Sequence, residues 1–177
     1  MRAPRTLPEQ LLRQAEHLAR LDRYKPSQAN LRRAVSASYY AIFHHLSSEC
    51  AKAVVGTRSA HGSVRHLVSR SFVHSDMADA SKRFRAPAAD LPSLVLVALA
   101  NHEVHSSVKQ VADAFVTLQQ KRHEADYDLS TPFVRENVVA IVEHSRAAIA
   151  AWQTARATPS AHVYLLSLLL WRQIKAK

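Results

Sequence analysis

Glycine is nearly absent from this chain of 177 residues, which contains only Gly56 and Gly62. Tight turns between β-strands depend on residues that adopt positive φ angles, and glycine supplies most of them. Alanine, leucine, arginine and glutamine, which favour helices, are plentiful. With 47% apolar residues, the chain is also long enough to bury one hydrophobic core. The sequence therefore predicts a single all-α domain.

Apolar residues recur at helical spacing along most of the chain. The clearest series ends at Gly56, a natural helix stop, and consists of Leu31, Val35, Tyr39, Ile42, Leu46, Cys50 and Ala53. We expect further helices over about 8–22, 63–73 and 93–122, one that starts at Thr131-Pro132, and a last one that starts at Thr158. Residues 76–92 are expected to form a loop with broken helix. This pattern predicts an up-and-down bundle over 8–156, followed by an additional helix over 158–175.

The segment Val163–Trp171 is hydrophobic nearly all round. We expect its helix to bury Val163, Leu166, Leu170 and Ile174. A helix of this kind must be covered on several sides, which predicts a homodimer or a tight heteromeric contact. Nine apolar residues are too few to span a bilayer, so no membrane association is expected. The single cysteine, Cys50, fits a buried structural thiol, and the protein is expected to be cytoplasmic.

Positive charge is concentrated in the first part of the chain. The net charge is +10, and residues 1–70 contain 12 Lys or Arg but only 4 Asp or Glu. Such a bias is typical of proteins that bind a polyanion such as RNA. Solvated arginines in a basic proteome would produce the same bias. Arg32 and Arg33 are the candidate phosphate contacts in this region.

Arg122 occupies an unusual position in the pattern. It follows the apolar series of the helix expected over 93–122, which runs Val97, Asn101, Val104, Val108, Val111, Phe115 and Leu118. A buried guanidinium needs a partner, and Glu124 and Asp126 are the nearest acids. Such an arginine either binds a phosphate bidentately or closes a salt bridge that only stabilises the fold.

The histidines form no recognisable metal site. His102 and His105 are three residues apart, which does not match H-E-x-x-H, and no cysteine or acidic cluster completes a ligand set. The chain also has no phosphate loop, dinucleotide-binding fingerprint or G-x-S-x-G motif. We therefore predict neither a metal nor a cofactor.

Three motifs resemble those of small prokaryotic HEPN-domain proteins. Residues 37–44, A-S-Y-Y-A-I-F-H, are similar to the R-x-Y-Y-A-x-F-H helix, with Ser36 in the register of the arginine and Arg33 one turn earlier. Residues 59–64, S-A-H-G-S-V, are similar to the T-H-x-G-V turn that follows. Residues 121–128, K-R-H-E-A-D-Y-D, are similar to the R-x-x-A-D-Y motif. The three motifs occur in the order and at the distances typical of that family.

The resemblance implies a helical bundle, often dimeric, that acts on RNA as a toxin or defence component. Many members are metal-independent endoribonucleases with an R-x4-6-H pattern, but here the residue five positions after Arg122 is Tyr127. The candidate catalytic residues are Arg122, His123, Asp126 and Tyr127. The candidate RNA-binding residues are Arg32, Arg33, Tyr40, His44 and His61, and the general base is expected to be His123, His44 or His61.

The resemblance also implies that a partner nucleotidyltransferase could modify Tyr127. Two alternatives remain at this stage. Tyr40 either stacks on an RNA base or packs against a neighbouring helix or a dimer partner. The whole protein is either an RNA-associated ribonuclease or a non-catalytic module that dimerises or docks on another protein. The absence of the histidine of the R-x4-6-H pattern favours the non-catalytic module.

Overall fold

Eight α-helices and two short 3-10 turns account for most of the described residues. The computed structural model describes residues 5–22 and 24–176, and within these ranges it contains no β-strand. The all-α prediction is confirmed. The helices are α1 (Leu7–Arg20), α2 (Gln28–Val55), α3 (Gly62–Arg70), α4 (His74–Arg85), α5 (Ser93–Leu99), α6 (Ser106–Tyr127), α7 (Arg135–Ala155) and α8 (Pro159–Lys175).

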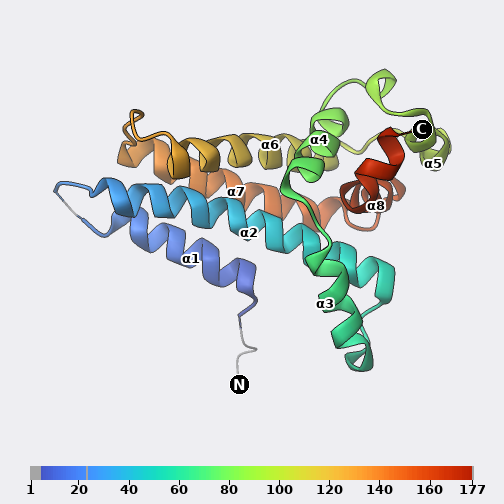
Figure 1. Cartoon of the computed structure of the whole chain (residues 1–177), viewed down its shortest axis with the longest axis horizontal. Coiled ribbons are helices and arrows are strands. Elements are labelled where there is room, and N and C mark those ends of the chain that lie inside the picture. Colours follow the sequence, from blue (N-terminus) through green and yellow to red (C-terminus); the bar gives the residue numbers. More distant parts are fainter. Residues whose placement is uncertain (1–4, 23, 177) are drawn as a thin grey trace.

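Four helices that lie side by side form the body of the protein. Figure 1 shows α1, α2, α6 and α7 side by side, with α4, α5 and α8 gathered at one end and α3 projecting from the C-terminal end of α2. Helix α2 ends where the apolar series predicted, because Gly56 adopts a φ of 84° that disfavours other residues. Helix α1 starts with a capping box in which the Thr6 amide donates to the Glu9 carboxylate over 2.8 Å.

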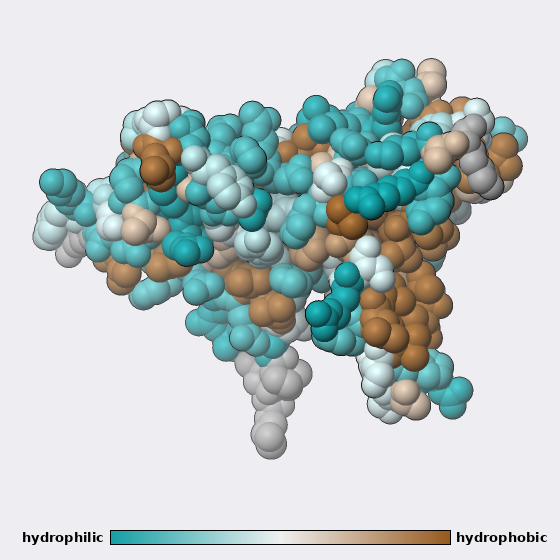
Figure 2. All heavy atoms as spheres, in the orientation of Figure 1, coloured by the Kyte–Doolittle hydropathy of each residue, from teal (hydrophilic) through white to brown (hydrophobic). Residues whose placement is uncertain are grey.

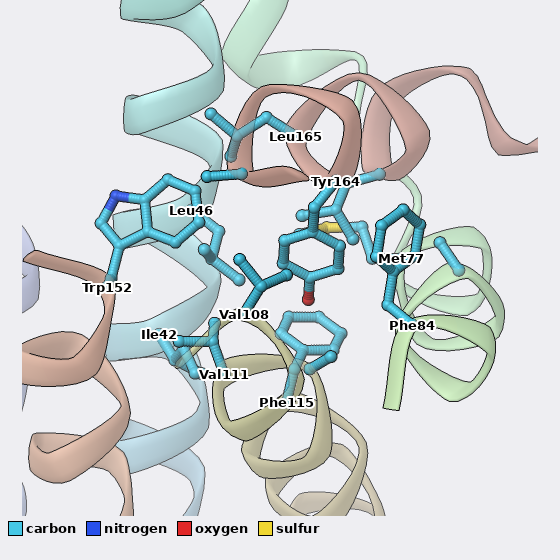
Figure 3. Packing of buried hydrophobic residues seen from close by; sticks show 14 of the residues in the cluster. Ile42, Leu46, Met77, Phe84, Val108, Val111, Phe115, Trp152, Tyr164 and Leu165 are labelled. Atoms are coloured by element: carbon cyan, nitrogen blue, oxygen red, sulfur yellow. The ribbon is translucent and has the colours of Figure 1, made fainter. Parts of the chain in front are cut away.

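The main core lies where α2, α4, α6, α7 and α8 meet. Figure 3 shows Tyr164 at its centre, near Phe115 and between Trp152 on one side and Phe84 on the other. The Tyr164 hydroxyl is buried and shares a hydrogen bond of 2.8 Å with Ser81. Helix α8 therefore belongs to the same core as the bundle rather than being an addition to it.

The prediction of a loop over 76–92 is wrong, because α4 occupies most of it. Met77, Ala80 and Phe84 are three and four residues apart and fully buried, and they pack into the main core. Asp76 is also buried and pairs with Arg172 of α8 at 2.6 Å. Alanine and charged residues hid this short apolar face from the sequence pattern.

The single helix predicted over 93–122 is also wrong. Ala100 and Asn101 have φ angles of 47° and 68°, in the left-handed region, so the right-handed helix ends there and α5 is separated from α6. Val97, placed on the apolar face by the sequence, is 75% exposed as a result. Helix α7 begins at Arg135 instead of Thr131, because the residues after α6 form a separate turn.

Helix α8 begins at Pro159 as expected, with Thr158 capping it, but it buries a different face. The buried residues are Tyr164, Leu165, Leu168 and Trp171, whereas Leu166 and Leu170 are 45% and 41% exposed. Val163 and Ile174 are partly buried against the core. The predicted face is therefore wrong at Leu166 and Leu170, and these two leucines face away from the bundle.

A second apolar area lies on α3 and the end of α2. Val54, Val64 and Leu67 are exposed there, and Figure 2 shows a broad apolar surface over these two segments. Among the described residues, no helix combines the length and apolar character needed to cross a membrane.

Candidate functional site

The site is built where α2 crosses the last turns of α6. Arg122 lies in this part of α6, and its Nε is 2.7 Å from Oδ2 of Asp126, one helical turn further on. Because the Nε–H is not aligned for a hydrogen bond, the contact is an ion pair. Nη2 donates to the hydroxyl of Tyr40 over 3.2 Å. No described residue bonds to Nη1, which leaves it available to a ligand.

Two tyrosine rings flank the guanidinium. The Cζ of Arg122 lies 5.8 Å from the centre of the Tyr40 ring and 5.4 Å from that of Tyr127, both within the range of cation–π attraction. The Arg122 side chain is 23% exposed. Burial alone would lower its pKa, but Tyr40 and Asp126 outweigh this and raise it, so the side chain stays cationic. The arrangement fixes the positive charge of Arg122 at the protein surface.

Asp126 is held from two sides. Besides its ion pair with Arg122, it accepts a hydrogen bond of 2.5 Å from the hydroxyl of Ser36. The hydroxyl of Ser36 thus helps to fix the orientation of the Asp126 carboxylate. The carboxylate in turn fixes the guanidinium. This contact joins α2 to α6 at the level of the site.

Histidines extend the site away from Arg122. The ring of His44 stacks on Tyr40 at 6.2 Å, and burial lowers its pKa. His74, at the start of α4, stacks on Phe43 at 4.2 Å and meets Tyr40 edge-on at 6.1 Å. Burial, and then Arg122 and His44, lower the pKa of His74. Both imidazoles are therefore neutral at pH 7.

His123 and Tyr127 lie next to Arg122 on the solvent-exposed side of α6. Their rings are 4.9 Å apart, His123 is exposed, and the side chain of Tyr127 is 63% exposed. The remaining candidate base, His61, lies at the far end of α2, where its Nδ1 meets the carbonyl of Val55 at 3.1 Å. The described contacts of His61 thus place it with the 3-10 turn before α3 and not with Arg122.

Arg32 and Arg33 have different environments despite being neighbours. The guanidinium of Arg32 donates to the carbonyls of Ala125, Asp128 and Thr131 over 2.9, 2.8 and 2.7 Å, and more weakly to that of Glu124. It thereby bonds to carbonyls in the last turn of α6 and in the segment directly after it. Arg33 is exposed, and no described residue makes such a contact with it.

Asp128 completes the end of α6. Its carboxylate accepts hydrogen bonds from the amide of Ser130 and from the hydroxyls of Ser130 and Thr131, which lower its pKa to about 2. Thr131 therefore belongs to this turn and not to the start of a helix. It fixes the direction of the chain directly after Tyr127.

Two open hollows lie on either side of Arg33. One, of about 440 Å³, is lined by Arg33, Ser36 and Tyr40 together with residues of α1. The other, of about 420 Å³, is lined by Arg33, Asp126 and Tyr127 among others. Both hollows reach residues that touch Arg122.

Nothing in the described part of the chain resembles a metal centre. No group of three or more His, Cys, Asp or Glu side chains converges there. Cys50 is buried beside the carbonyl of Leu165, and burial raises the pKa of its thiol to about 12, so it is a poor nucleophile.

The structure brings together members of the two predicted groups: Arg122, Asp126 and Tyr127 of the candidate catalytic residues, and Tyr40 and His44 of the candidate RNA-binding residues. The sequence analysis did not predict that the two groups meet, and it did not include Ser36 and His74. Ser36 had a readable signal, because positions 32, 36, 40 and 44 are four apart and share one face of a helix. His74 had none, since it reaches the site only through the packing of α4.

Comparisons with known proteins supply no relative: no family model matches the chain, and neither the curated proteins nor the solved structures contain a match.

Proposed function

We propose that this protein is a HEPN-like RNA-associated protein whose Arg122 site binds a phosphodiester. The observation that carries the proposal is the guanidinium of Arg122, held by Asp126 between two tyrosine rings with Nη1 free. A planar cation with a free donor matches an anionic phosphate oxygen, and the tyrosine rings offer faces on which bases stack. Arg33 supplies a second positive charge between the two hollows.

The activity that fits this site is metal-independent cleavage of RNA, as in a toxin or defence component. The 2′-oxygen attacks the adjacent phosphorus, the bond to the 5′-oxygen breaks, and a 2′,3′-cyclic phosphate and a 5′-hydroxyl form. Arg122 stabilises the charge that develops on the phosphate. A neutral imidazole accepts the 2′-hydroxyl proton, and His44 and His123 lie on the two sides of Arg122. The 5′-oxygen takes a proton from water.

Partners follow from two exposed features. Tyr127 is 63% exposed at the end of α6, which makes its hydroxyl accessible to a nucleotidyltransferase of the kind that the family resemblance implies. Leu166 and Leu170 are exposed on one side of α8 and provide an apolar surface for a homodimer or a heteromer. The same leucines favour the second candidate function, a non-catalytic module that docks on another protein through these helices.

One experiment separates the two functions. Purified protein is incubated with total RNA in EDTA, beside Arg122→Ala and the control Arg156→Ala, which removes an exposed arginine at the end of α7. Cleavage by the wild type and by the control, lost in Arg122→Ala, supports the proposal. RNA that stays intact and unbound with all three proteins refutes it and leaves the docking function.

A further inference from the structure

His74 is the one histidine of the site whose hydrogen-bond partner can be assigned. Its Nδ1 lies 2.5 Å from the hydroxyl oxygen of Tyr39 on α2. Its ring is also fixed by the stack on Phe43 and by the edge contact with Tyr40. The residue remains exposed, and no described residue bonds to its Nε2. His74 thus has one ring nitrogen bonded within the protein and the other without a partner among the described residues.

The Tyr39 hydroxyl decides which nitrogen of His74 carries the proton. Tyr39 is fully buried, and burial raises its pKa, so the phenol keeps its proton. Among the described residues, Nδ1 of His74 is the only hydrogen-bond partner of this hydroxyl. A buried O–H without an acceptor is costly, so Tyr39 donates and Nδ1 accepts. In the neutral imidazole the proton then sits on Nε2.

The surroundings keep this imidazole neutral. Helix α2 presents Tyr39, Tyr40 and His44 to it, and α6 presents Arg122 together with Gln119, whose amide bonds to the His74 carbonyl over 2.9 Å. The charged or chargeable groups that act on it, Arg122 and His44, are both cationic when protonated. A second proton on His74 is therefore disfavoured at pH 7, and its Nε2–H is a constant donor.

We infer that His74 completes the Arg122 site as a neutral hydrogen-bond donor, whose Nε2–H binds an oxygen of the same phosphodiester that Arg122 binds. Tyr39 acts as its positioning residue. The inference rests on the proposed function for the identity of the ligand. It assigns His74 a role different from that of a general base: a histidine that already carries its proton on the exposed nitrogen binds and polarises a phosphate but does not accept the 2′-hydroxyl proton.

The tautomer is tested without any ligand. Long-range ¹H–¹⁵N NMR spectra at pH 7 distinguish a protonated Nε2 from a protonated Nδ1. We expect His74 to show the neutral Nε2–H form, and Tyr39→Phe to show a mixture of both tautomers. A His74 that is an imidazolium at pH 7, or that carries its proton on Nδ1, overturns the inference.

The ligand contact is tested by fluorescence anisotropy with a 2′-O-methyl RNA octamer, which cannot be cleaved. The double variant Tyr39→Phe/His74→Phe keeps the ring stack and leaves no orphan hydroxyl, and His66→Phe serves as an exposed control on α3. We expect the double variant to bind about tenfold more weakly, the typical effect of losing one hydrogen bond to a charged acceptor. His74→Gln restores a donor and is expected to recover part of this loss, while His66→Phe binds normally.

The outcomes separate this inference from the proposed function. Loss of binding in Arg122→Ala with none in the double variant overturns the role of His74 and leaves the Arg122 site intact. A wild-type protein that does not bind the octamer at all overturns both. Circular dichroism of each variant shows whether the protein compared is folded.

Discussion

Replacing Arg32 by methionine is expected to lower stability far more than replacing its neighbour Arg33. Methionine keeps the aliphatic stem but removes the donors that bond to three carbonyls, in the last turn of α6 and in the segment after it, over 2.7 to 2.9 Å. It also removes the cation over the Phe133 ring at 5.2 Å. At about 1 kcal/mol net for each of the three hydrogen bonds, the free energy of unfolding should fall by about 3 kcal/mol. That corresponds to a melting temperature lower by roughly 6–12 °C for a chain of this size.

Urea unfolding followed by circular dichroism measures this difference. Arg33→Met is the matched control, because Arg33 is adjacent and exposed without a described partner, and its free energy of unfolding should change by less than about 0.5 kcal/mol. The reasoning is refuted if Arg32→Met loses less than about 1 kcal/mol, or if the two variants unfold at the same urea concentration. The charge-based expectation that both arginines contact RNA does not predict this contrast.

Four further outcomes follow from the structure. Arg122→Ala should lower the free energy of unfolding by only about 1–2 kcal/mol, because Asp126 keeps its hydrogen bond to Ser36. Tyr127→Phe should leave it almost unchanged. A loss above about 2 kcal/mol for Arg122→Ala, with RNA affinity unchanged, would show that the ion pair only stabilises the fold. Asp76→Asn should cost about 1 kcal/mol in thermal unfolding, because it removes the negative charge of buried Asp76 that pairs with the exposed side chain of Arg172; an unchanged melting temperature contradicts this. Burial lowers the pKa values of His44, His45 and His74 in the folded protein. The unfolded chain, with an ordinary histidine pKa of 6.5, therefore binds more protons, and the free energy of unfolding should fall as the pH drops below about 7. A stability that stays constant between pH 7 and 5 would be inconsistent with the burial of these histidines. Light scattering at micromolar concentration should show an oligomer that Leu166→Lys together with Leu170→Lys dissociates, and a wild-type monomer argues against this interface.

Long, regular helices could be predicted from the sequence because their apolar residues follow a simple period. Helix α2 is the best case, since its large buried residues recur every three or four positions and Gly56 ends it. Helix α4 could not be recognised, because its buried face consists partly of alanine and serine and includes Asp76, which becomes buried only with its partner on α8. The break at Ala100 and Asn101 has no glycine or proline to mark it.

The candidate site was predictable only as far as local spacing reaches. Arg122 and Asp126 are one helical turn apart, so their pairing could be anticipated from sequence alone. The contact of Arg122 with Tyr40, 82 residues earlier, depends on how α2 packs against α6. The roles of Arg32 and His74 depend on tertiary contacts in the same way, and charge counting cannot distinguish an arginine that caps a helix from one that faces solvent.

One face of α2 connects the stability of the bundle to the geometry of the site. Positions 32, 36, 40 and 44 lie one turn apart along it: Arg32 holds the end of α6, Ser36 fixes Asp126, Tyr40 bonds to Arg122, and His44 stacks on Tyr40. Because the contacts from Arg32, Ser36 and Tyr40 are arranged in register, a shift of α6 by one turn would break these three together. The position of the Arg122 guanidinium is therefore set by the same packing that buries the core. A ligand that binds it does not incur the entropic cost of ordering this side chain.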